Sequence, residues 1–82
     1  MNTISDLENL KNQDCFPFGS AYDYLMATLE DYYIAKSNGT ERIKKELENW
    51  DQESRKIIID TLIESIGSTL QNFSGNDLRL LI

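Results

Sequence analysis

The chain has 82 residues, of which 40% are hydrophobic and 27% charged, and its formal net charge at pH 7 is −6. This length allows one domain and is too short for two, and the composition is that of a soluble globular protein rather than of a disordered chain. The excess of acid disfavours direct binding to nucleic acid, which depends on clustered lysine and arginine, and favours a basic partner, unless it serves only to keep the protein in solution.

Glycine and proline divide the chain into segments whose apolar residues recur at helical spacing. These breaks lie at Pro17, Gly19, Gly39, Gly67 and Gly75. The segments between them lack the alternation of apolar and polar residues that is typical of a strand. We therefore predict an all-α fold with a single helical domain over residues 1–82. The domain is expected to be a small bundle of four main helices with a short extra C-terminal helical segment.

The first predicted helix covers residues 4–12 and is followed by a loop with two phenylalanines. Its apolar seam consists of Ile4, Leu7 and Leu10. Pro17 disfavours a helical conformation at Phe16, so the helix has to end before this residue. We expect Phe16 and Phe18 to fill part of the core from this loop.

The second predicted helix begins after the N-cap Ser20 and runs to about Ser37. A projection at about 100° per residue places on its buried side Tyr22, Leu25, Met26, Leu29, Tyr32 and Tyr33. The opposite side carries Asp23, Tyr24, Ala27, Glu30, Asp31 and Ile34. An aromatic and an aliphatic residue exposed among acids are typical of a protein interface. We predict a partner-binding surface, the acidic face, made of Asp23, Tyr24, Glu30, Asp31 and Ile34. The alternative is that the first or the third helix covers Tyr24 and Ile34.

The third predicted helix follows Gly39, which we interpret as the C′ residue that ends the second helix. Thr40 is then the next N-cap, and the helix continues to Trp50. Its apolar seam consists of Ile43, Leu47 and Trp50. The charged residues between these positions are expected to form a solvated outer surface.

The fourth predicted helix starts near Asp51 and is the most apolar of the four. Its buried face is predicted to carry Ile59, Leu62, Ile63, Ile66, Leu70 and Phe73. Ile57 lies on the opposite side, where it extends an apolar patch or is covered by Trp50. Gly67 costs the helix ~1 kcal/mol relative to alanine, so we expect the helix to bend there or to let a neighbour approach closely.

The last segment is a short helix that Ser74, Gly75 and Asn76 separate from the fourth one. Its apolar edge consists of Leu78, Leu81 and Ile82. This edge either packs into the bundle or docks against a second copy of the chain.

Residues that carry common catalytic chemistry are missing. The chain has no histidine and a single cysteine, Cys15, which excludes the usual catalytic triads, most zinc sites and an internal disulfide. It also lacks a glycine-rich phosphate loop and a calcium-loop pattern. Paired carboxylates such as Glu30 and Asp31 remain, but acids along a helix usually form a solvated face. We predict that the protein is not an enzyme and has no cofactor or metal site.

Membrane insertion and secretion are also disfavoured. The longest aliphatic run is residues 57–59, whereas about 20 apolar residues are needed to span a bilayer. Asp6 and Glu8 stand where a secretory signal would have a basic start and an apolar run. We expect a cytoplasmic protein that does not bind a membrane.

Two functions remain. The first is a small acidic module that binds, and thereby inhibits or neutralises, a basic protein partner through the acidic face. In size and charge the chain resembles bacterial immunity proteins against nuclease toxins and phage-encoded inhibitors of host defence. Residues 31–33, Asp-Tyr-Tyr, resemble the acid and tyrosine cluster of the colicin nuclease immunity proteins, although no proline follows them. The second is a homo-oligomerising structural or regulatory subunit that pairs through the fourth helix or the apolar C-terminus.

Overall fold

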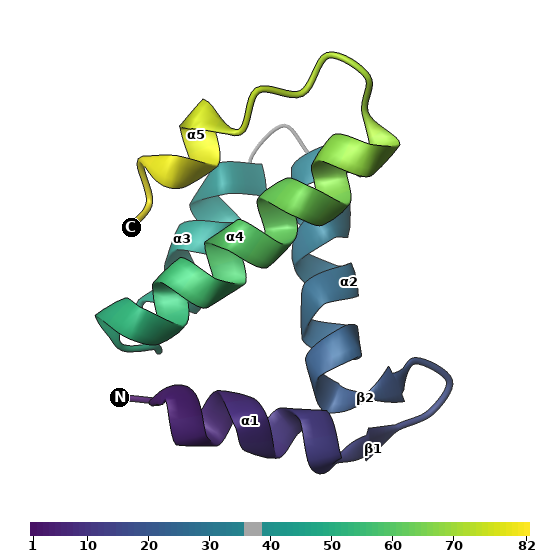
Figure 1. Cartoon of the computed structure of the whole chain (residues 1–82), viewed down its shortest axis with the longest axis vertical. Coiled ribbons are helices and arrows are strands. Elements are labelled where there is room, and N and C mark those ends of the chain that lie inside the picture. Colours follow the sequence, from purple (N-terminus) through teal and green to yellow (C-terminus); the bar gives the residue numbers. More distant parts are fainter. Residues whose placement is uncertain (36–38) are drawn as a thin grey trace.

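The computed structural model describes residues 1–35 and 39–82, and these form five helices and one small hairpin (Figure 1). In chain order the elements are α1 (Ile4–Asn12), β1 (Asp14–Cys15), β2 (Gly19–Ser20), α2 (Ala21–Ala35), α3 (Gly39–Leu47), α4 (Gln52–Thr69) and α5 (Asn76–Arg79). The predicted all-α class is confirmed, with four main helices and a short fifth one near the C-terminus. The predicted end of the second helix near Ser37 lies outside the described residues.

The four main helices pack around one core, in which α2 is central. This helix contacts α1 at its beginning and both α3 and α4 along its length. Fully or almost fully buried side chains come from every helix: Leu7, Met26, Leu29, Ile43, Leu47, Trp50, Ile58, Ile59, Leu62, Ile66 and Leu78. The burial of Leu78 shows that the short C-terminal helix packs into the bundle, as the first of the two predictions for it stated.

The buried side of α4 is rotated relative to the predicted one. Ile59, Leu62 and Ile66 are buried as expected, but Ile63 is only half-buried and Leu70 is exposed. Ile58, which the projection left out, is fully buried. Leu70 is the C-cap residue, which follows the last turn of α4. Because the prediction included Leu70 in the buried face, that face was centred too far from Ile58.

Both ends of the turn between α3 and α4 are fixed by backbone hydrogen bonds. The amide of Asn2 donates to the carbonyl of Asn49, and the amide of Asp51 donates to the carbonyl of Asn2, each at 2.8 Å. The Asp51 side chain caps α4 by accepting from the amide of Ser54 at 2.9 Å. The contact with Ser54 lowers the pKa of Asp51 below its usual value, because a donor beside the carboxylate favours its ionised form. The N-terminal residues therefore lie against the start of α4 in a fixed position.

Gly39 is the first residue of α3 and permits a close approach between α3 and α2. Thr40 therefore lies inside α3, and the prediction that it is the N-cap of this helix was wrong. The predicted end of the second helix just before Gly39 lies outside the described residues. A Cβ atom at this position would lie 2.6 Å from the Cα of Tyr33 and would overlap the carbonyl of Tyr32. Backbone atoms in two helices leave no flexible group that can move aside, which explains a glycine here.

We expect Gly39→Ala to lower the free energy of unfolding by about 1–3 kcal/mol, because the helices have to separate to admit the methyl group. The matched control is Gly67→Ala, since Gly67 is exposed in α4 and its Cβ would meet the Phe73 ring at an ordinary 3.5 Å. That change is expected to stabilise the protein by about 0.5–1 kcal/mol. Urea denaturation of both variants measures the two effects, and a neutral Gly39→Ala would contradict the close approach.

The loop after α1 differs from the prediction. Residues 14–20 form an antiparallel hairpin in which Cys15 pairs with Gly19, and the amide of Phe18 donates to the carbonyl of Cys15 at 2.7 Å. Phe16 is 96% exposed at the tip, and Phe18 is also exposed. The expectation that these two rings fill the core was wrong, because the short pairing holds residues 16–18 away from the bundle.

Candidate functional site

The structure leaves four of the five residues of the predicted acidic face exposed on α2. Asp23 and Asp31 are exposed, and Tyr24 and Ile34 have exposed fractions of 48% and 46%. Glu30 is half-buried at the edge of this surface, where its carboxylate accepts a hydrogen bond from the Ser65 hydroxyl of α4. Glu30 therefore helps to hold α2 against α4, and the other four residues remain open to a partner.

The hairpin covers part of the Tyr24 side chain. The Phe18 ring meets the Tyr24 ring edge to face, with 5.0 Å between the ring centroids and 62° between the planes. Phe16 lies beside Phe18 in sequence and is almost fully exposed. We call the set Phe16, Phe18 and Tyr24 the aromatic tip. The aromatic tip extends the predicted partner-binding surface to Phe16 and Phe18, which were expected to fill the core.

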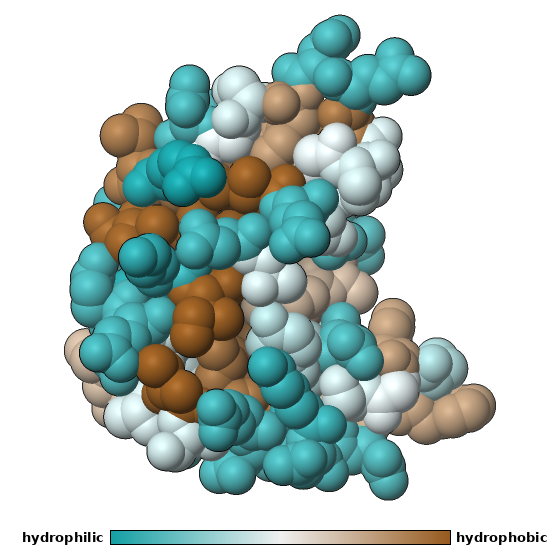
Figure 2. Space-filling view, viewed as in Figure 1, coloured by the Kyte–Doolittle hydropathy of each residue, from teal (hydrophilic) through white to brown (hydrophobic). Residues whose placement is uncertain are grey.

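The hairpin that carries the aromatic tip projects from the bundle at the start of α2 (Figure 1). In the same view of the surface, apolar side chains form a knob at the lower right, where this hairpin lies (Figure 2). Backbone hydrogen bonds hold its base, including one from the amide of Ala21 to the carbonyl of Gln13 at 2.8 Å. The tip therefore presents its rings on a backbone with defined pairing at its base.

The sequence around the aromatic tip is acidic without compensating bases. Residues 12–35 contain no lysine or arginine and four acids: Asp14, Asp23, Glu30 and Asp31. Lys11, the nearest base in sequence, lies over the Tyr22 ring, with its ammonium nitrogen 5.0 Å from the ring centroid. Exposed negative charge thus accompanies the exposed rings on the hairpin and on α2.

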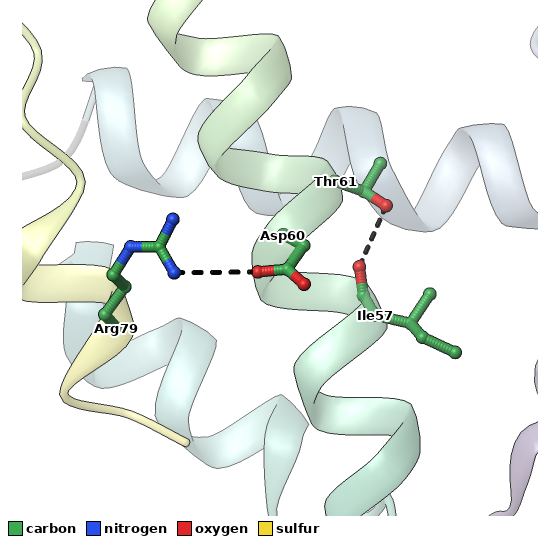
Figure 3. Close-up of polar contacts among 4 residues, drawn as sticks. All are labelled: Ile57, Asp60, Thr61 and Arg79. Atoms are coloured by element: carbon green, nitrogen blue, oxygen red, sulfur yellow. Dashed lines mark hydrogen bonds and ion pairs between the residues drawn. The ribbon is translucent and has the colours of Figure 1, made fainter.

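The exposed side of α4 carries Ile57 and Asp60, and Thr61 lies at its edge toward Tyr22 of α2 (Figure 3). Arg79 of α5 pairs with Asp60 at 3.8 Å, and both side chains are about half exposed, so the pair adds little to stability. Thr61 donates its hydroxyl to the carbonyl of Ile57 at 2.8 Å. The Ile57 side chain is exposed and points away from the ion pair. Of the two predictions for Ile57, the one in which Trp50 covers it is wrong.

The surface of the described residues includes the following two hollows. One has a volume of about 490 Å³ and is bordered by α1, α2 and α3, including Tyr24. The other, of about 510 Å³, lies beside the chain segment that joins α4 to α5. Within residues 1–35 and 39–82, no three metal-ligating side chains come together, and no helix is long and apolar enough to cross a membrane.

The hairpin could have been recognised from its sequence signals. Pro17 and Gly19 stand two residues apart between Asp14 and Ser20, a spacing that favours a tight reversal over an open loop. A reversal of this kind exposes the residues at its tip, whatever their hydrophobicity. No family model matches the chain, and neither a curated protein nor a solved structure matches it.

Proposed function

We propose that this protein is a small cytoplasmic module that binds a basic protein partner and inhibits or neutralises it by occupying its surface. The observation that supports this most directly is the aromatic tip, in which a 96% exposed phenylalanine projects from a hairpin. Apolar side chains that are exposed next to one another, as Phe16, Phe18 and Tyr24 are, mark interaction sites more often than scattered single ones do. The proposed contact surface consists of the aromatic tip and the exposed part of the acidic face.

The aromatic tip is suited to supply binding energy. Full burial of a phenylalanine side chain contributes about 1.5–3 kcal/mol, and interfaces commonly depend on a few such aromatic residues. Hydrogen bonds already fix the base of the hairpin, so less backbone freedom has to be lost on binding. A partner of matching shape would present an apolar pocket to Phe16.

The acids around the tip favour a basic surface on that partner. Asp14 and Asp23 flank the hairpin, and Asp31 lies farther along α2. Charges at the rim of an interface mainly raise the association rate and exclude partners of like charge. The apolar pocket on the partner is therefore expected to be bordered by lysine or arginine.

We expect Phe16→Ala to weaken partner binding by at least about 1 kcal/mol and to change the free energy of unfolding by less than about 0.5 kcal/mol. The partner would first be isolated from the native host with the wild-type protein and identified by mass spectrometry. The affinities of both proteins for the purified partner would then be measured by calorimetry. Unchanged affinity of a folded Phe16→Ala variant would contradict the role of the tip.

Leu80→Ala is the matched control, because Leu80 is another exposed apolar residue, with an exposed fraction of 82%, far along the chain from the hairpin. It also tests the second function, a homo-oligomer that pairs through the C-terminus. Leu78 is buried within the bundle and Leu81 is half-buried, so Leu80 and Ile82 are the C-terminal residues open to a second copy. A dimer that dissociates on Leu80→Ala would favour that function over the proposed one.

A further inference from the structure

The groove bordered by α1, α2 and α3 is apolar along most of its length. Its α2 wall is one stripe of the helix made of Ala21, Tyr24, Leu25, Thr28 and Tyr32. Leu10 of α1 closes it on one side, and Glu46 and Trp50 border it on the other. The volume of about 490 Å³ lies in the range of sites that hold a small ligand or a large side chain.

Glu46 is the one ionisable carboxylate among the lining residues. One of its oxygens accepts a hydrogen bond from the indole nitrogen of Trp50 at 3.4 Å. In the described part of the chain, no lysine or arginine lies within ion-pair distance of this carboxylate. The Thr28 hydroxyl is already bonded to the carbonyl of Tyr24 at 2.9 Å, so Thr28 adds little free polarity. A half-buried carboxylate on an apolar wall favours a cation as its partner.

The tyrosines of α2 already attract cations within this protein. The Arg42 guanidinium lies over the ring of Tyr32, with 5.2 Å between its carbon atom and the ring centroid, and Tyr22 receives Lys11 in the same way. Cations bind the faces of aromatic rings through the ring quadrupole. Arg42 already occupies Tyr32 in this way, whereas Tyr24, with an exposed fraction of 48%, can act in this way toward a cation from outside.

We propose that this groove receives a lysine or arginine side chain of the basic partner. Its methylene groups would lie on Tyr24, Leu25 and Tyr32, and its charged end would meet the Glu46 carboxylate. Such side chains combine an apolar stem with a charged end, which matches the groove. The proposal rests on the proposed function for the existence of the partner. Tyr24 belongs to both the groove and the aromatic tip, so one partner can engage the two together.

The groove can be tested on the isolated protein with N-acetyl-arginine amide as the probe. We expect the probe to shift the backbone amide resonances of Leu25, Thr28 and Glu46 in a saturable NMR titration. N-acetyl-norleucine amide has a similar stem without the charge and is expected to bind at least about threefold more weakly. Equal binding of the two probes, the absence of shifts, or shifts centred on Asp31 or Asp60 would overturn the proposal.

Two variants separate the groove from general attraction to an acidic protein. Glu46→Gln is expected to weaken binding of the arginine probe by about three- to fivefold, whereas Glu48→Gln, an exposed residue of the same region outside the groove, leaves it within about twofold. Equal losses would overturn the proposal. If Glu46→Gln does not fold, the comparison of the two probes on the wild type decides. If the arginine probe binds in the groove but Phe16→Ala leaves partner affinity unchanged, the proposed function is contradicted and the groove is not. If Phe16→Ala weakens partner binding but the probe does not bind, the groove is contradicted and the proposed function is not.

Discussion

Leu62→Ala is expected to lower the free energy of unfolding by about 2–5 kcal/mol, which is a large part of the total stability of a domain of this size. Leu62 is fully buried near the middle of α4. Truncation removes apolar contacts and leaves a cavity that helices from several directions cannot close completely. Urea denaturation followed by circular dichroism measures the change.

Ile57→Ala on the same helix is the matched control for Leu62→Ala. Ile57 is exposed, so its truncation removes few contacts and is expected to cost less than about 1 kcal/mol. Ile63→Ala is expected to fall between the two, because Ile63 is half-buried. Lys44→Ala on the solvated side of α3 is expected to cost less than about 0.5 kcal/mol. Equal losses for Leu62→Ala and Ile57→Ala would show that α4 faces the core with another side.

The double change Tyr24→Ala with Asp31→Lys is expected to weaken partner binding by at least about 2 kcal/mol. Tyr24 joins the aromatic tip to the groove, and Asp31 is an exposed acid on the same helix. The double change therefore removes an aromatic contact and reverses a charge. Because Asp31 is exposed and Tyr24 is about half exposed, the melting temperature is expected to stay within a few degrees of the wild-type value.

Calorimetry with the captured partner measures this loss, and the same titration at rising salt concentration tests its electrostatic part. Binding of the wild type is expected to weaken as salt rises, because exposed charges are screened over about 8–10 Å at moderate ionic strength. Asp60→Lys, a charge reversal on α4, is the control for net charge alone. A folded double variant with wild-type affinity would place the contact surface elsewhere, with Ile57 and Leu80 as the next residues to change.

The helices could be predicted from the sequence because each has a clear apolar period and a clear break. The period of α1 is carried by Ile4, Leu7 and Leu10, and its bounds agree with the prediction. The cap at Asp51 likewise marked the start of α4. The exposed residues of the acidic face followed from the same helical projection, since Asp23, Tyr24, Asp31 and Ile34 lie opposite the buried side of α2. Whether a partner binds there stays a prediction.

The parts that were missed depend on contacts between segments. Hydrophobicity alone suggested that Phe16 is buried, but the pairing of Cys15 with Gly19 determines where its ring lies. The hydrogen bond between Ser65 and Glu30 joins two helices, so the projection of α2 by itself could not show that Glu30 is half-buried. The groove likewise needs Glu46 of α3 and Leu10 of α1 beside α2, and no spacing within one helix reveals such an arrangement.

The hydrogen bonds between Asn2 and the turn at Asn49–Asp51 also bear on how the chain folds during its synthesis. Asn2 is made before Asn49 and Asp51, so these two hydrogen bonds can form only after the turn that follows α3 has been made. By contrast, α1 with α2 and α2 with α3 are neighbours in the chain that pack against each other, and each pair can associate earlier because contacts between segments close in sequence form at low entropic cost. Translation therefore favours an order in which these helix pairs form first and the residues before α1 are fixed against the start of α4 later.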